Sequence, residues 1–218
     1  MALDFKIDNV ENAIFVLGEM FAEEERAAEY ARFWFSKLEM IEEAVGALPD
    51  EDKVKVYWEN TMTAYKTISK KASNHEVVEM AGGFNIARDL EAGYPEVDPE
   101  WVIMQNPDVI IKYPMGADYQ GGFGHSETEP FDEVRREMMG RAGFDQIKAV
   151  QDGEVYVVSQ IIKTGAFENV AVCYVARMLY PDLFADLDPA AHLQEMVEKY
   201  MGLDFAEMNG VFVYPEPW

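Results

Sequence analysis

Apolar residues recur at helical spacing through the first part of the chain. Between residues 9 and 45 they fall three, four or seven positions apart, which places them on one face of a single long helix. Gly46, followed by Pro49, marks the end of this helix. At 1.5 Å per residue the helix would be about 50 Å long. The glutamates at 23–25 leave room for a kink.

A different pattern follows, in which short apolar runs alternate with amphipathic segments. The runs at 53–58, 108–112 and 154–158 predict strands, and the second has the Val-Ile-Ile core typical of a strand buried on both faces of a parallel sheet. Helices are predicted at 75–81, 99–105, 130–141, 166–180 and 189–201. The Pro-rich tail is expected to pack along the surface. This order indicates an α/β fold, a three-layer sandwich with a mostly parallel central sheet, preceded by a long backbone helix.

The charge of the chain is strongly one-sided. Its 218 residues include 41 acidic and 18 basic side chains, which gives a formal net charge of −23. A surface this acidic repels phosphate backbones and anionic lipid headgroups, so we expect neither nucleic-acid binding nor direct membrane insertion. It suits a cationic partner, a salty environment or simple solubility.

Cysteine content and hydropathy add little about location. Cys173 is the only cysteine and lies in an apolar run, so we expect a small buried hydrophobic residue and no disulfide within the chain. No apolar stretch approaches the 18 residues of a membrane-spanning helix. The first residues lack the basic and apolar regions of a signal peptide. If the protein is exported, its signal has been removed or lies outside this sequence.

The sequence carries no motif that is typical of an enzyme. His75, His125 and His192 lie far apart, and none has the spacing of a metal-binding motif. We expect His75 and His192 to be structural, whereas His125 lies in a Gly-rich loop where a binding role is conceivable. Nucleophile elbows, phosphate-binding loops and dinucleotide fingerprints are absent from the sequence. We therefore predict a protein that is not an enzyme and has no intrinsic metal or cofactor.

A ligand-binding site is better supported. Open α/β sheets bind ligands beyond the carboxyl ends of their strands, and here those ends carry aromatic residues, methionine and a few polar groups. That mixture suits a large, partly apolar ligand held by stacking and a few hydrogen bonds. Some of these side chains are expected only to pack the loops. The ligand-binding residues that we predict there are Glu59, Asn60, Tyr65, Lys66, Tyr113, Met115, Tyr119, His125, Gln160, Lys163 and Phe167.

Five short sequence segments, taken together, resemble those of a known protein family. They are the turn at 82–85 (Gly-Gly-Phe-Asn), the Asn-Pro-Asp-Val-Ile-Ile stretch at 106–111, the hairpin-like 149–156, the helix start at 12–29 and the Tyr-Pro-Asp-Leu-Phe stretch at 180–184. With these phrases the chain resembles the substrate-binding proteins of ABC importers for iron–siderophores, haem and cobalamin. Those proteins have two lobes that are joined by one long helix.

The resemblance implies an arrangement in which residues 1–48 are the interlobe helix and 49–218 the C-terminal ligand-binding lobe, with the N-terminal lobe absent from this sequence. Such a chain alone would bind ligand weakly or not at all. The whole protein would work outside the cytoplasm, in the periplasm or at the cell surface, with a lipid anchor as one option. It would capture a ferric siderophore, haem or cobalamin and deliver it to the permease subunits of the transporter.

Two residues take roles from the resemblance alone. Glu100, in the first turn of its helix, matches the glutamate by which the C-terminal lobe docks into arginine pockets of the permease. A plain acidic residue, favoured there by the helix dipole, is the simpler alternative. Tyr94 matches a position at the mouth of the ligand cleft.

Two other functions remain open from the sequence. A cofactor-binding domain of the nitrogenase-component type has a related architecture, although a metal cluster needs several thiolates and the chain has one cysteine. A purely structural or interaction domain would use the acidic surface to meet a basic partner. As for the ligand, the loops offer few arginines, which favours a neutral or weakly charged macrocycle over a net-anionic chelate.

Overall fold

The central sheet has five strands in the order β2-β1-β3-β5-β7. The computed structural model describes residues 7–115, 121–163, 165–208 and 210–217. The strands are β1 (Lys55–Asn60), β2 (Phe84–Asn85), β3 (Val109–Tyr113), β5 (Val155–Val158) and β7 (Val213–Tyr214). The first four run parallel and β7 pairs antiparallel with β5. The mostly parallel α/β sheet that the sequence predicted is therefore confirmed.

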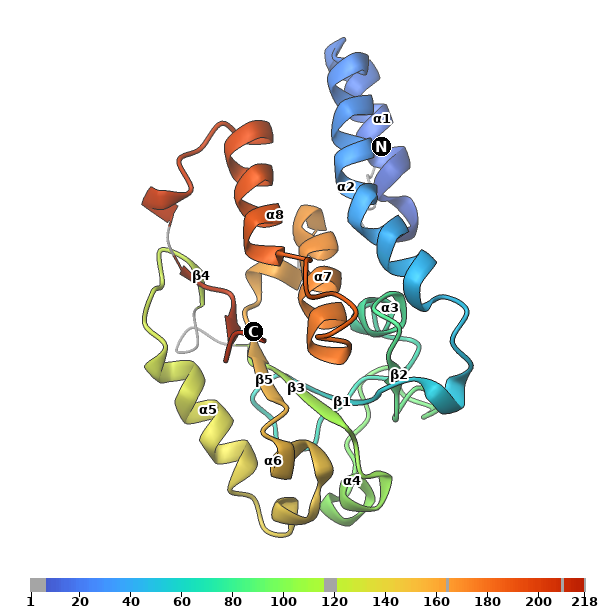
Figure 1. Ribbon diagram of the computed structural model, residues 1–218, viewed down its shortest axis with the longest axis vertical. Helices are drawn as coiled ribbons and strands as arrows, with labels where there is room; N and C mark the ends of the chain where they lie inside the picture. The colour runs from blue at the N-terminus through green and yellow to red at the C-terminus, as the bar shows by residue number, and fades with distance from the viewer. Residues whose placement is uncertain (1–6, 116–120, 164, 209, 218) are drawn as a thin grey trace.

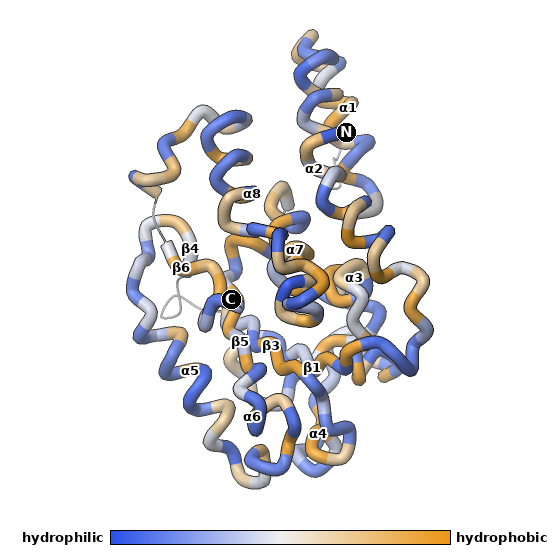
Figure 2. The backbone as a smooth tube through the Cα atoms, in the orientation of Figure 1, coloured by the Kyte–Doolittle hydropathy of each residue, from blue (hydrophilic) through white to orange (hydrophobic). Residues whose placement is uncertain are grey.

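Helices cover both faces of the sheet (Figure 1). One face is covered by α2 (Glu24–Val45), α3 (Asn74–Met80) and α7 (Glu168–Leu179), whose apolar residues share one core with β1 and β3. The opposite face carries α4 (Pro99–Gln105), α5 (Glu129–Met139) and α6 (Lys148–Asp152). Next to α7 lies α8 (Pro189–Glu195), which continues as a π-helical turn, Met196–Tyr200. Figure 2 shows hydrophobic residues gathered along α7 and the central strands, and hydrophilic residues along α5.

The predicted helix at 9–45 is in fact two helices. After α1 (Ile7–Phe21) the backbone turns at Ala22, whose φ is +54°, and the amide of Glu23 donates to the carbonyl of Gly18 at 2.8 Å. This is the hydrogen bond of a Schellman-type helix end. A Cβ on Gly18 would lie 2.5 Å from the Cβ of Ala27, so the glycine lets α1 pack closely beside α2 (Figure 1). The apolar stripe is continuous because both helices use it to face one core.

The segment before the Pro-rich tail forms a strand that the sequence did not predict. It adds β7 to the sheet, where Val213 pairs with Val158. Just before it, β6 (Gly210–Val211) pairs antiparallel with β4 (Gly122–Phe123). The apolar Val-Phe-Val run at 211–213 explains this outcome, because its side chains are at least half-buried against the two cores.

Three residues that the sequence assigns to the protein interior are buried. Cys173 is fully buried, and burial raises the pKa of its thiol to about 12. His192 is buried beside Asn169, with burial lowering its pKa to about 4. His75 is buried next to Asn85. Their surroundings agree with the sequence prediction.

Within the described ranges, none of the helices combines the length and apolarity needed to cross a bilayer.

Candidate ligand-binding site

The carboxyl ends of β1, β3 and β5 bring part of the predicted site together. Asn60 lies opposite Tyr113 in the parallel register, and the amide of Thr61 donates to the Tyr113 carbonyl at 2.8 Å. Beyond β5, the side-chain amide of Gln160 donates to the carbonyl of Pro114 at 3.1 Å. We call this place the carboxyl edge. Three residues from distant parts of the sequence thus meet there.

Tyr113 is the centre of this edge. Its buried ring lies 6.1 Å from that of Trp58, and burial, followed by the charge of Glu168 and the influence of Tyr94, raises its pKa to about 12. Tyr113 is therefore a neutral hydrogen-bonding group at physiological pH. Tyr94 and Met115, which were both predicted to line the site, are 45% and 46% exposed.

The loop after β5 contributes a buried ion pair. The Lys163 ammonium contacts the Glu168 carboxylate, and both side chains are more than 90% buried. Short 3₁₀ turns at Ile161–Lys163 and Gly165–Phe167 shape this loop. From the other side, the indole N–H of Trp34 on α2 donates to the carbonyl of Ala166 at 2.8 Å. The loop is thus fastened to α2, and its lysine is neutralised.

An aromatic cluster borders the same loop. The ring of Phe167 lies 5.6 Å from that of Phe123, which in turn lies 5.1 Å from Phe212 and 6.5 Å from Phe205. Sequence reasoning included Phe167 but missed Phe205 and Phe212, although the Val-Phe-Val run was an available signal. His125 is exposed, and its carbonyl accepts from Val211 at 2.8 Å. Tyr119 lies outside the described residues.

Glu59 lies behind the carboxyl edge instead of on it. Its carboxylate is fully buried and accepts from Lys112 Nζ at 2.6 Å and from both terminal nitrogens of Arg141 at 2.6 and 2.9 Å. It also accepts from the amide of Tyr65 at 2.8 Å and the hydroxyl of Tyr57 at 3.2 Å. We call these five residues the Glu59 cluster. Its carboxylate oxygens are directed at protein donors.

The cluster keeps Glu59 ionised. Burial alone would raise the pKa of this carboxyl, but the hydrogen bonds from Arg141 and the charge of Lys112 outweigh it and hold the pKa below the usual range. An unpaired charge at such a depth would be strongly unfavourable, whereas this one is fully compensated. The cluster can therefore act as a rigid internal anchor.

The neighbouring loop has an unusual backbone. Thr61 and Tyr65 have φ values of +64° and +62°, in the left-handed region that costs a non-glycine residue about 1–3 kcal/mol. The Arg141 guanidinium lies 4.8 Å from the centre of the Tyr65 ring. Lys66 forms an antiparallel bridge with Glu96, and its ammonium has no ion-pair partner among the described residues. Backbone strain of this kind is concentrated at functional sites.

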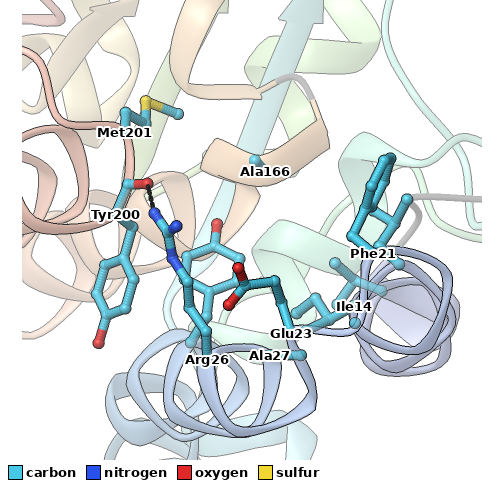
Figure 3. A pocket seen from close by; sticks show the side chains of 12 residues that line it. Ile14, Phe21, Glu23, Arg26, Ala27, Ala166, Tyr200 and Met201 are labelled. Carbon is cyan, nitrogen blue, oxygen red and sulfur yellow. Dashed lines mark hydrogen bonds between the residues drawn. The ribbon is translucent and has the colours of Figure 1, made fainter.

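An apolar cavity of about 490 Å³ lies between the two N-terminal helices and the loop after β5. Figure 3 shows Arg26 reaching the carbonyl of Tyr200, with Ala166 at the far side and Phe21 at the edge. The hydrogen bond to Tyr200 is 3.2 Å long. The sequence did not predict this cavity, because its pattern indicated one long helix over 9–45, and the cavity forms between two.

Glu100 is exposed in the first turn of α4. It lies three residues after Val97, whose amide donates to the carbonyl of Tyr65 at 3.1 Å. The predicted docking residue is thus connected by a short stretch of chain to the loop that follows β1.

Comparisons with solved structures support the fold. The chain is similar to the TroA-like periplasmic binding protein FepB from Veillonella parvula, with 24% identity, a TM-score of 0.83 and coverage of 97% of this chain and 63% of FepB. It is also similar to a periplasmic heme binding protein from Pseudomonas aeruginosa, with 16% identity, a TM-score of 0.62 and coverage of 83% and 61%.

A relative of known function and a family model indicate the family of the chain. The molybdate-binding protein MolA of Haemophilus influenzae is 23% identical over 198 residues, which are 88% of this chain and 50% of MolA. The chain thus spans about half the length of this relative. The model described as "Periplasmic binding protein" matches residues 1–161, well over half of the chain. The protein belongs to the periplasmic binding protein family.

Proposed function

We propose that this chain is the ligand-binding lobe of an ABC importer's solute-binding protein. Working outside the cytoplasm, the whole protein captures a metal chelate or corrinoid (a ferric siderophore, haem or cobalamin) and delivers it to the permease subunits. The observation that carries the ligand class is the carboxyl edge. It offers the exposed side chains of Tyr94 and Met115 near the partly buried rings of Phe123 and Phe167, while the nearby cations Lys112 and Lys163 are neutralised by internal glutamates.

The charge pattern separates two kinds of ligand. A large, weakly charged ring system gains from stacking and needs few fixed charges. A small oxyanion needs several uncommitted donors, and Arg141 directs its guanidinium at Glu59 and Glu137. Molybdate is nevertheless the second candidate, because MolA is a relative and the Lys66 ammonium has no ion-pair partner among the described residues.

A titration tests the ligand class. The longer protein, in which we propose that another lobe accompanies this chain, is titrated with cyanocobalamin, haemin, a ferric catecholate siderophore and molybdate by calorimetry. We expect one of the first three to bind and Tyr94→Ala to weaken it about tenfold, through loss of one aromatic contact. The control is Leu183→Ala, an exposed apolar residue two positions after Pro181, which lies near Val54 and Val109 at the amino ends of β1 and β3; it leaves the affinity unchanged.

Two outcomes would count against this assignment. Binding of molybdate alone overturns the chelate class but keeps the family role. Binding of none of the four overturns the proposed ligand class and leaves the family, which the sequence match shows, unchanged.

We also propose that residues 1–48 connect a preceding lobe to the lobe formed by 49–218. The support is the exposure of large apolar side chains on α1: Phe21, at the edge of the cavity in Figure 3, is 70% exposed, and Phe15 and Met20 are 41% and 61% exposed. Exposed apolar groups of this size favour a helix that another part of the protein covers. The 218-residue chain should therefore bind its ligand at least about a hundredfold more weakly than the longer protein, because one wall of the cleft is missing.

For Glu100 we propose the docking role. Glu100→Lys should lower ligand uptake by at least about tenfold, because a lysine facing an arginine-lined pocket is repelled. The affinity for free ligand should not change. The matched control is Glu39→Lys, an equal charge reversal at an exposed position of α2. Uptake that is equal in both variants would remove the docking role.

A further inference from the structure

The segment of residues 61–67, which we call the strap, fastens the end of β1 to the segment before α4. The amide of Thr67 donates to the carbonyl of Pro95 at 2.9 Å, and the amide of Val97 donates to the carbonyl of Tyr65 at 3.1 Å. The two segments therefore run antiparallel, like a short ribbon. The strap holds the chain on either side of residue 96.

Tyr94 depends on this ribbon. It precedes Pro95 directly, and the carbonyl of Gly93 on its other side accepts from the amide of Ser69 at 3.0 Å. Tyr94 is thus held between two backbone anchors, although its own side chain is 45% exposed. The strap also reaches Tyr113, because the amide of Thr61 donates to the Tyr113 carbonyl at 2.8 Å, so it connects the segment of Tyr94 to the carboxyl edge.

The strap does not hold its own shape by backbone preference. Thr61 and Tyr65 are both left-handed, and a β-branched threonine strongly disfavours that region. A segment with two such residues relaxes unless its surroundings determine its conformation. Something next to the strap must therefore supply the constraint.

The Glu59 cluster supplies it from two sides. The Glu59 carboxylate receives the Tyr65 amide at 2.8 Å, and the Arg141 guanidinium that grips this carboxylate also lies 4.8 Å from the Tyr65 ring centre. Lys112, on the central strand β3, donates from its Nζ to Oε1 of the same Glu59 carboxylate at 2.6 Å. Both the backbone and the ring of Tyr65 therefore contact charged groups that are buried and paired with one another.

We propose that Glu59 is a positioning residue, which fixes the strap through Tyr65 and thereby places Tyr94 at the rim of the ligand site. This inference rests on the proposed function for its consequence in binding, but its structural step stands separately. Glu59 does not contact the ligand. It acts through the Tyr65 amide, the strap and the ribbon that the strap forms with the segment before α4.

Hydrogen exchange measures the structural step without any ligand. In the 218-residue chain, Glu59→Gln should raise the exchange rates of the Tyr65 and Val97 amides by about tenfold or more, while the amides of β3 stay protected. The matched control is Glu137→Gln, which removes the other, exposed carboxylate partner of Arg141 and leaves Glu59 intact. That control should leave exchange in the strap unchanged.

A conservative variant keeps the test decisive if Glu59→Gln does not fold. Arg141→Lys retains the charge but loses the two-pronged grip and the stacking on Tyr65, so strap exchange should lie between that of the control and that of Glu59→Gln. Equal acceleration in the strap and in β3 would show a merely structural residue. Unchanged exchange in the strap would also overturn the proposal.

Ligand binding is the second measurement. With cyanocobalamin and haemin as probes on the longer protein, Glu59→Gln should weaken binding about tenfold, as expected for the loss of one placed aromatic contact, and Glu137→Gln should not. If the unaltered protein binds neither probe, cobalamin and haem are excluded as its ligand, while the exchange result still decides the positioning role. Unaltered affinity in a Glu59→Gln protein with a loosened strap would overturn the link to the ligand site.

Discussion

Replacing Arg141 with alanine is expected to lower the free energy of unfolding by about 3–5 kcal/mol, the usual cost of breaking a buried ion pair. The reason is Glu59, which would stay buried with Lys112 as its one charged partner. The variant also removes the guanidinium that packs over Tyr65. Urea denaturation of the two proteins, with equal slopes, measures the difference.

Arg136→Ala is the matched control for this prediction. Its side chain is 60% exposed and pairs with Glu129 and Asp132 at the surface of α5. Exposed pairs of this kind contribute about 0–1 kcal/mol. If the two variants lost similar stability, the depth of the Glu59 cluster would not matter and the prediction would be wrong.

Trp34→Ala is expected to cost a similar amount, about 3–5 kcal/mol, because it opens a large cavity in the main core. The indole is fully buried, and its N–H donates a hydrogen bond to the carbonyl of Ala166, which connects α2 to the loop that carries Lys163. Trp34→Phe separates the contribution of the side-chain volume from that of the hydrogen bond. It keeps most of the volume and loses the hydrogen bond, so the free energy of unfolding should fall by about 1 kcal/mol.

The control for Trp34 is Met40→Ala on the exposed side of the same helix. It should change the free energy of unfolding by less than about 0.5 kcal/mol. Thermal unfolding of all four proteins gives the ranking directly. A Trp34→Ala protein as stable as the Met40→Ala protein would show that α2 does not depend on this contact.

The sheet was predictable because its signals are local. Val109 to Ile111 form a continuous apolar run, Pro99 marks a helix start, and such features depend on neighbours in sequence. The family of solute-binding proteins also agrees with the lack of a catalytic motif. The helix at 9–45 was different. Its break at Ala22 uses a left-handed residue other than glycine, and the apolar spacing continues across it.

The candidate site was only partly accessible to such reasoning. Asn60 and Tyr113 were placed together because parallel strands end at one edge of the sheet. Glu59 is one residue away from Asn60, and the alternation of side chains along β1 directs it into the opposite core, toward Arg141. Arg141 is 82 residues distant, and a pairing so remote leaves no pattern in a single sequence.

The two outermost strands of the sheet have a practical consequence. β2 and β7 are each two residues long, and β7 is followed directly by Pro215, which has no amide proton to offer. Edge strands this short expose very few unpaired backbone N–H and C=O groups, so a second molecule has little to pair with if it adds a strand. Together with the net charge of −23, they should keep the polypeptide free of amyloid-like assembly at high concentration.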